Sequence, residues 1–357
     1  MTMNSSFQSL PGSLRKDSGG NIVELPQLAP SFGRPRRRFD AAKIETSVRK
    51  IAADYHMDSN ETAMFLRSLL YIMPQPYMYK YPEIKYADLF PVNYGVPTGA
   101  KTHAFHEFDE LGQAQIIDNY ADTAPSVEEI GYEIIGQIYP VRSEYSYSIQ
   151  DIRSAQYSGT PLDAMKAMTA RRIIERKCDT LAAVGDVKHN FTGILNNPSS
   201  TAVTPGTKAA GGTTWAVATP AEILLDCNAL LKGVFVPTHG TFTPDTLVFG
   251  TSNWALINTL RLDTYNMLTV GKYLLDSLPW INSLEYWPQL DTAGSSSREI
   301  VFATQRNREN YEIIVPQDFE QFPPQPKNLS FLINCHKRFG GVQMRFPLSC
   351  ASMVGTV

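Results

Sequence analysis

The chain has 357 residues, enough for one large domain or two to three smaller ones with a substantial buried core. Apolar residues make up 43% and charged residues 19% of the chain, a balance typical of a globular protein. The formal net charge of −3 disfavours a compact nucleic-acid-binding domain, which usually carries a strong basic excess.

The four cysteines lie far apart and form no CxxC pair. This spacing indicates small buried thiols in a reducing compartment, and neither a zinc site nor a disulfide framework. The first twenty residues lack the apolar run of a secretory signal. The most apolar window, AEILLDCNALLKGVFV, is too short and too interrupted by charges to span a bilayer. The sequence therefore predicts a soluble protein without a membrane partner.

Residues 1–38 are rich in Ser, Gly, Pro and Gln and end in GRPRRRF, which is typical of a flexible arm. Residues 1–50 carry nine basic and four acidic side chains, a net charge of +5. Two interpretations of RPRRR stay open: a solvated tail, or contact with a polyanion or an acidic surface of a neighbouring subunit. Residues 39–73 are predicted to be helical, with Asp40 and Ser59 as N-caps.

Residues 84–149 are rich in Tyr, Ile and Val with partial alternation, so EIKYADLFPVNYG and IGYEIIGQIYPVRSEYSYS are predicted as strand segments. A polar stretch, LGQAQIIDNYADTAPSVEE, lies between the strand signals. The pattern predicts a long two-stranded ribbon. Because an isolated ribbon is only marginally stable in water, we expect it to lie against a neighbouring subunit.

The clearest helix signal covers residues 161–184, with Thr160 as N-cap, Pro161 at the first helical position and Gly185 at the end. A buried stripe is predicted at Leu162, Met165, Ile174, Cys178 and Leu181.

Later segments add shorter elements. Thr219 and Glu222 match a capping box at the start of a helix. DTLVFGTSNWALINTL predicts a strand followed by a helix with Ser252 as its cap, VGKYLLDSL predicts a further short helix, and strands follow from residue 299. PGTKAAGGTT lacks the Gly-Lys-Ser/Thr ending of a phosphate loop, so we interpret it as a flexible, glycine-rich surface loop. The overall class is α+β.

The stretch THAFHEFDE concentrates five potential metal ligands, His103, His106, Glu107, Asp109 and Glu110. In a strand, residues an odd number of positions apart point to opposite faces, so the two histidines cannot converge on one ion. On a helix the order still differs from the zinc-binding His-Glu-x-x-His motif. We therefore interpret the stretch as a solvated strand, and expect no catalytic residue, cofactor or metal.

The order of segments resembles the major capsid proteins of tailed bacteriophages, with the Hong Kong 97-type fold. The resemblance is clearest from AQIIDNYADTAPSVEEIGYEIIGQIYPVRSEYSYSIQDIRSA through FTGILNN, which matches the family's extended loop, returning strand, spine helix and the turn into the apical domain. NYEIIVPQDFEQFPPQPKNLSFLINCHKRFGGVQMRFPLSCASMVG resembles its last strands.

The resemblance implies a division of the chain into four parts. These are an N-terminal arm at residues 1–92, an extended β-hairpin loop at 93–149, a peripheral domain at 150–192 and 299–357 with spine helix 161–184, and an apical domain at 193–298.

The resemblance also implies a structural, non-enzymatic protein that self-assembles as hexamers and pentamers into an icosahedral shell. The shell encloses double-stranded DNA through non-specific lumenal contacts, is assembled in the bacterial cytoplasm, and has portal, scaffold and decoration proteins as further partners. We predict interface residues in the extended loop at Ile116, Ile117, Asn119 and Tyr120. Arm contacts are predicted at Arg36, Arg37 and Arg38.

Some relatives crosslink a lysine of the extended loop to a neighbour. Residues 112–129 contain no lysine, and Lys101 lies at the base, so no crosslink is expected. Two alternatives remain. An encapsulin-type nanocompartment would share the fold and enclose an enzyme. A metal-dependent hydrolase would use His103, His106 and Glu107.

Overall fold

The computed structural model describes residues 14–16, 22–24, 79–116, 126–159, 162–262, 268–294 and 298–354. The chain divides into two units, Met1–Glu83 and Ile84–Val357. In the first unit, β1 (Leu14–Lys16) pairs antiparallel with β2 (Ile22–Glu24). The helices expected within residues 39–73 lie outside the described residues.

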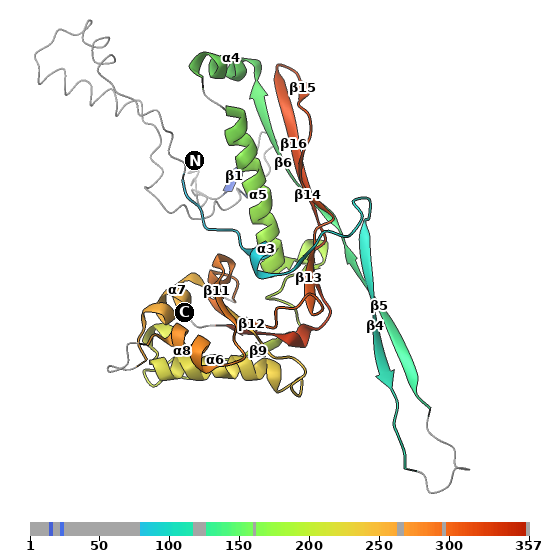
Figure 1. The fold of residues 1–357 in the computed structure, drawn as a ribbon. Coiled ribbons are helices and arrows are strands. Elements are labelled where there is room, and N and C mark those ends of the chain that lie inside the picture. The colour runs from blue at the N-terminus through green and yellow to red at the C-terminus, as the bar shows by residue number, and fades with distance from the viewer. Residues whose placement is uncertain are drawn as a thin grey trace, which may run out of the picture. The chain divides into compact units, whose positions relative to one another are not determined.

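The second unit contains mixed helices and strands (Figure 1). Its α-helices are α3 (Tyr86–Leu89), α4 (Ile149–Ser158), α5 (Leu162–Val184), α6 (Pro220–Phe235), α7 (Thr251–Thr259) and α8 (Val270–Ser277). Its 3₁₀ turns are η1 (Val187–His189), η2 (Trp215–Val217), η3 (Pro288–Asp291) and η5 (Pro347–Ser349). Its strands are β3 (Val92–Asn93), β4 (Thr102–Leu111), β5 (Glu128–Gln137), β6 (Tyr139–Ser148), β7 (Gly185–Asp186), β8 (Phe191–Thr192), β9 (Thr201–Val203), β10 (Thr246–Phe249), β11 (Ser283–Tyr286), β12 (Ile300–Thr304), β13 (Tyr311–Ile314), β14 (Gln317–Gln321), β15 (Gln325–Lys327), β16 (Ser330–Phe339), β17 (Val342–Met344) and β18 (Cys350–Val354).

The long helix α5 packs against β6 and β16, which pair antiparallel over ten residues each (Figure 1). The predicted helix of 161–184 is confirmed for the described residues, and Ile174, Cys178 and Leu181 of its stripe are buried while Met165 is half-buried. Gly185 follows the helix with φ +72°, a left-handed conformation that glycine adopts without a steric penalty. The expected cap Thr160 lies outside the described residues.

A five-stranded sheet of order β11-β10-β12-β18-β9 separates two hydrophobic cores. Its strands β10 and β12 are fully buried, and alternate residues face opposite sides. Val248, Phe302 and Cys350 belong to the core that α5 covers. Leu247, Phe249, Val301, Ala303, Ala351 and Met353 belong to the core around α6, α7 and α8. These strands therefore consist almost entirely of apolar residues instead of alternating ones.

Two local predictions are wrong. EIKYADLFPVNYG, expected as a strand, contains the one-turn helix α3 and only the two-residue strand β3. Helix α7 has Gly250 as its N-cap and not Ser252, because the buried carboxylate of Glu299 accepts the Asn253 N–H at 3.0 Å in place of a local cap. A partner 46 positions away leaves no local signal.

The last strands pair in two different sheets, and the expected grouping of residues 299–357 with the long helix stays a prediction. β12 and β18 pair with β10 and β9 in the five-stranded sheet, whereas β14, β15 and β16 lie in the sheet that includes β6. The segment therefore contributes strands to both layers. In the described ranges of the chain, no helix combines the length and hydropathy needed to cross a bilayer.

Candidate assembly site

Strands β4 and β5 form a two-stranded antiparallel ribbon, called the ribbon below, as the sequence predicted. All ten residues of each strand pair directly, from Thr102 opposite Gln137 to Leu111 opposite Glu128. Within the described parts of the chain, neither strand pairs with a third strand, and seventeen of the twenty residues are exposed. A ribbon this exposed is marginally stable in isolation, so its surface is suited to contact with another surface.

The pairing register assigns each side chain to one of two faces, because directly opposite residues share a face and successive residues alternate. One face carries an apolar row made of Phe105, Leu111, Ile130, Tyr132 and Ile134. Tyr132 is 56% and Ile134 44% exposed, so this row is open to water. An exposed apolar row of this kind marks an interaction surface.

Carboxylates lie on both faces of the ribbon: Glu107, Asp109 and Glu128 share the face of the apolar row, and Glu110, Glu129 and Glu133 lie on the opposite face. Glu110 lies directly across from Glu129, and Glu133 across from His106. Residues 102–140 contain eight Asp and Glu residues and no Lys or Arg. Like charges directly opposite one another destabilise a strand pair. The ribbon therefore carries a negative charge that its own residues do not balance.

The histidines of THAFHEFDE lie on opposite faces of the ribbon, with His103 on the face of the apolar row and His106 on the other face. The hypothesis of one metal site using both is therefore wrong. No cluster of three or more His, Cys, Asp or Glu suited to a metal occurs among the residues that the structure describes. The His103 ring lies over Gly136, where a Cβ atom would come within 2.3 Å of it. Burial lowers the pKa of His103, and the charge of Glu312 opposes this shift. His103 is therefore a packing residue at the base of the ribbon.

The predicted interface residues are only partly described. Ile116 follows the ribbon and is 96% exposed. Ile117, Asn119 and Tyr120 lie outside the described residues, as do Arg36, Arg37 and Arg38 of the arm. Their contacts with a neighbouring subunit stay a prediction.

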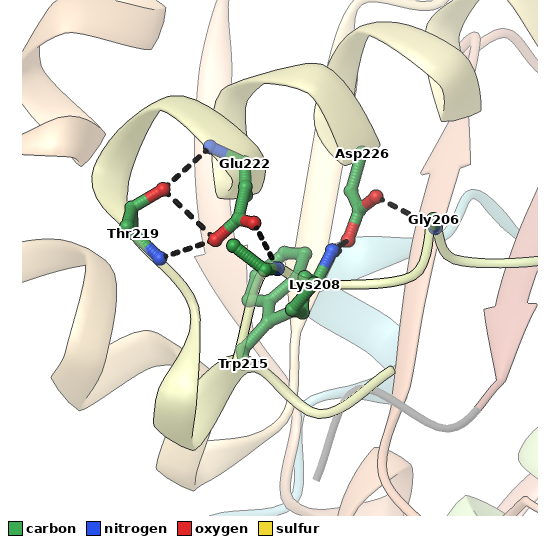
Figure 2. Close-up of polar contacts among 7 residues, drawn as sticks. Gly206, Lys208, Trp215, Thr219, Glu222 and Asp226 are labelled. Atoms are coloured by element: carbon green, nitrogen blue, oxygen red, sulfur yellow. Dashed lines mark hydrogen bonds and ion pairs between the residues drawn. The ribbon is translucent and has the colours of Figure 1, made fainter. Parts of the chain in front are cut away.

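The glycine-rich segment 205–214 is anchored by a buried ion pair (Figure 2). Lys208 pairs with Asp226 of α6, and the two side chains are 1% and 5% exposed. The same carboxylate accepts the Trp215 indole N–H at 2.8 Å and the Gly206 N–H at 3.0 Å. The prediction of a flexible surface loop is wrong for Lys208, since its charge is neutralised inside the protein by a residue 18 positions away.

The start of α6 holds the same segment from a second point (Figure 2). The predicted capping box is confirmed: Glu222 accepts the Thr219 N–H at 2.7 Å, and the Thr219 hydroxyl accepts the Glu222 N–H at 3.4 Å. The other Glu222 oxygen accepts the Ala209 N–H at 2.7 Å. The Glu222 carboxylate thus caps the start of α6 and also binds the backbone of the glycine-rich segment.

A second buried cation lies between α5 and β16. Lys337 is 2% exposed, and its ammonium donates to Glu175 at 2.8 Å, to Asp318 at 3.0 Å and to the Tyr86 hydroxyl at 3.1 Å. Burial alone would lower the pKa of Lys337, but the two carboxylates raise it above its usual value. The register between β14 and β16 shifts between Gln317 and Glu320. Such an irregularity changes the direction of a side chain, and here Asp318 accepts a hydrogen bond from Lys337. Sequence reasoning missed this cluster, although period-two alternation places Lys337 in the inward row of its strand.

Asp179 of α5 is a third buried polar centre. Its carboxylate accepts the Tyr86 N–H at 3.2 Å, the Trp287 indole N–H at 3.0 Å and the Gln289 amide at 2.8 Å. Burial raises the pKa of Asp179, and these donors oppose the shift. The group joins three segments that are far apart in the sequence.

The buried groups Lys208, Lys337 and Asp179 have their partners within the subunit, while the ribbon is exposed and acidic. This division indicates a structural protein that presents surfaces to other molecules. The model of the Major capsid protein family matches residues 112–353, which is more than half of the chain. The chain belongs to this family. A protein of the family is a structural subunit of a virion capsid and assembles with its own copies into a shell.

Solved structures of phage proteins share the fold. The capsid of Myoviridae phage XM1 is similar with a TM-score of 0.72 at 13% identity, over 81% of this chain and 97% of that chain. A protein of Gordonia phage Cozz has a TM-score of 0.59 at 9% identity, over 84% and 95%. A protein of Mycobacterium phage Adephagia has a TM-score of 0.55 at 15% identity, over 90% and 98%. None of the curated proteins matches the chain.

Proposed function

We propose that this protein forms the icosahedral head shell of a tailed, double-stranded DNA bacteriophage. Family membership and the fold shared with phage capsids support the proposal. The observation that carries it furthest is the ribbon, which is exposed along both faces. A subunit that keeps such a ribbon stable needs a second subunit to cover it.

In the proposed shell, copies form hexamers and pentamers, and the ribbon lies over an adjacent copy. The four parts named from the sequence remain our proposed division: arm 1–92, extended loop 93–149, peripheral domain 150–192 with 299–357, and apical domain 193–298. The sheet pairing supports one refinement, in which β12 and β18 belong to the sheet of the apical part.

The proposed function implies further partners. A shell that holds a genome works with a portal, a scaffold and decoration proteins, and is assembled in the cytoplasm of the bacterial host. The net charge of −3 is consistent with weak, non-specific contact between its lumenal face and DNA.

Electron microscopy and sedimentation of the purified protein test the proposal. We expect rings or closed shells. A strict monomer at high protein concentration and at every salt concentration would contradict it. The contents of the purified shells distinguish a phage head from a nanocompartment of the same fold. A phage head holds DNA, whereas a nanocompartment holds an enzyme.

Deletion of residues 1–38 tests the arm. We expect the truncated subunit to unfold at the same denaturant concentration as the full chain, because the removed strands β1 and β2 pair with one another in a sheet of their own, and to assemble poorly. Shells of normal yield and stability from the truncated protein would refute a role of the arm in assembly.

A further inference from the structure

The face of the ribbon with the apolar row, called the mixed face below, also carries the carboxylates Glu107, Asp109 and Glu128. Glu107 lies directly across from Tyr132, and both side chains are exposed. The opposite face carries as many carboxylates but only two large apolar side chains, those of Phe108 and Ile135. A partner that covers the mixed face therefore needs apolar side chains and positive charge together.

Helix α5 carries the densest group of cations in the described chain. Within twelve residues it contains Lys166, Arg171, Arg172, Arg176 and Lys177. No separate stretch of that length in the described ranges holds more than three Lys and Arg residues. Glu175, the one acid among them, accepts hydrogen bonds from the Lys337 ammonium and the Tyr86 hydroxyl. Glu175 is thus engaged inside the subunit, and the exposed side of α5 keeps a positive charge.

Four exposed side chains of α5 form one stripe, called the basic stripe below, made of Met168, Arg172, Ile173 and Lys177. Residues four positions apart on a helix share a face, which groups Met168 with Arg172 and Ile173 with Lys177. Met168 is 54% and Ile173 50% exposed. Neighbouring side chains lie about 6 Å apart along such a stripe and about 7 Å apart along one face of a strand. The basic stripe therefore offers apolar and cationic groups at a spacing close to that of the mixed face.

Other exposed cations of the described chain match the mixed face less well. Arg142 lies in an ion pair with Glu144 at 3.1 Å. Lys101 and Lys327 are each at least ten positions from the nearest other Lys or Arg in the sequence. A single cation is a weak counterpart for several carboxylates along a strand.

We propose that the mixed face of the ribbon docks on the basic stripe of α5 in a second copy of this chain. The inference rests on the proposed function, because it names the surface that covers the ribbon in the assembled shell. Both surfaces are exposed within one subunit, so the contact joins two copies. Opposite charges orient the two surfaces, and burial of the apolar side chains between them stabilises the contact.

Cysteine crosslinking in DNA-free shells of the full chain tests the proposal. Tyr132→Cys on the mixed face is combined with Ile173→Cys on the basic stripe, both at exposed positions, while the four native cysteines are buried. After oxidation we expect a ladder of covalent multimers on a non-reducing gel, because every subunit carries both new thiols. The control combines Ile173→Cys with Ile135→Cys, 61% exposed on the opposite face, and should give no ladder. Ladders of equal yield in the two variants, or a ladder in neither, would overturn the proposal.

A charge exchange keeps the test decisive if the cysteine variants form no shells. We expect Glu107→Lys with Asp109→Lys to lower the yield of shells about tenfold, because like charges across an interface repel. Addition of Arg172→Glu and Lys177→Glu to this variant should raise the yield again by about tenfold. No restoration would overturn the proposal.

The matched control changes the charge of the ribbon equally on its opposite face, with Glu110→Lys and Glu133→Lys. In this background we expect Arg172→Glu with Lys177→Glu to restore nothing. Equal restoration for the two faces would overturn the proposal, because the effect would then follow net charge alone.

Two other outcomes would also overturn it. Restoration by Lys101→Glu or Lys327→Glu in place of the α5 pair would assign the mixed face to those cations. Shells of Arg172→Gln with Lys177→Gln that form at wild-type yield but hold less DNA would assign the basic stripe to the polyanion. Failure of the wild-type protein to form any shell would instead contradict the proposed function itself.

Discussion

Charged side chains have opposite environments in the ribbon and in the rest of the second unit, called the body below. In the body, Lys208 and Lys337 are almost fully buried, and each is paired with carboxylates of distant elements. In the ribbon, Glu110 and Glu129 are exposed and lie directly across from one another. A buried charge is tolerated only when it is paired, whereas an exposed charge is solvated by water and is accessible to another subunit.

The difference separates residues that determine folding from residues that determine assembly. Substitutions at the buried pairs are expected to lower the free energy of unfolding of the subunit. Substitutions in the ribbon are expected to leave that free energy nearly unchanged and to lower the yield of shells.

The largest effect on stability is expected from Asp226→Ala. The change leaves the Lys208 ammonium buried without its counter-ion and removes the acceptor of the Trp215 indole N–H. We expect the unassembled subunit to lose about 3–5 kcal/mol in denaturant unfolding. Asp276→Ala, at an exposed position of α8, is the control and should change stability by less than about 0.5 kcal/mol. A loss below about 1 kcal/mol at Asp226 would mean that the ion pair does not stabilise the body.

Two glycines that follow helices provide the second test of the body. Gly185 and Gly159 have φ of +72° and +68°. A Cβ at Gly185 would lie 2.2 Å from the Phe191 carbonyl oxygen, whereas a Cβ at Gly159 would meet no atom within 4 Å. We expect Gly159→Ala to lower the free energy of unfolding by about 1 kcal/mol, because it adds backbone strain alone. We expect Gly185→Ala to lower it by about 3 kcal/mol, because a steric clash adds to the strain. Equal costs in denaturant unfolding would contradict the tight packing after α5.

Glu299 predicts a pH dependence of stability. Burial raises the pKa of Glu299 from its usual 4.5 to about 7, and its bond with the Asn253 N–H opposes the shift. Between pH 4.5 and 7 the folded protein therefore retains a proton that the unfolded chain has lost. Stability should fall as pH rises through this window, by on the order of 2–3 kcal/mol from this group.

Glu299→Gln removes the titration while keeping an oxygen that can accept the Asn253 N–H. We expect the unfolding free energy of the variant to vary less between pH 4.5 and 7 than that of the wild type. Parallel curves for the two proteins would show that another group causes the dependence.

The smallest effect on the subunit is expected at Ile116 and Ile117, which follow β4 of the ribbon in the sequence. Ile116→Asp with Ile117→Asp adds charge at a position that is already 96% exposed at Ile116, so stability should change by less than about 0.5 kcal/mol. Shell yield in sedimentation should fall strongly. Val187→Asp, at a position 92% exposed outside the ribbon, is the control. Equal loss of folding and assembly in the Ile116 and Ile117 variant would place these residues in a core.

Local sequence patterns correctly predicted the elements whose stabilising interactions lie within a few residues of one another. Gly185 ends α5 because a left-handed residue favours glycine, and the Thr219–Glu222 capping box starts α6 because both partners lie within one turn. The ribbon followed from alternation and from the absence of enough apolar residues to bury both faces. The opposite faces of His103 and His106 followed from their odd separation in a strand.

Predictions failed where a partner comes from far along the chain. Nothing near Lys208 in the sequence indicates that Asp226 neutralises it, and nothing near Asn253 indicates that Glu299 caps its helix. The tertiary structure alone decided that β12 and β18 join the five-stranded sheet, because uniformly apolar strands fit any buried sheet equally well. By itself the sequence determined the helices α5 and α6, the ribbon and the excess of charge that the ribbon carries. Which buried charges meet was decided by tertiary structure, since ion pairing depends on distance in space and not on distance along the chain.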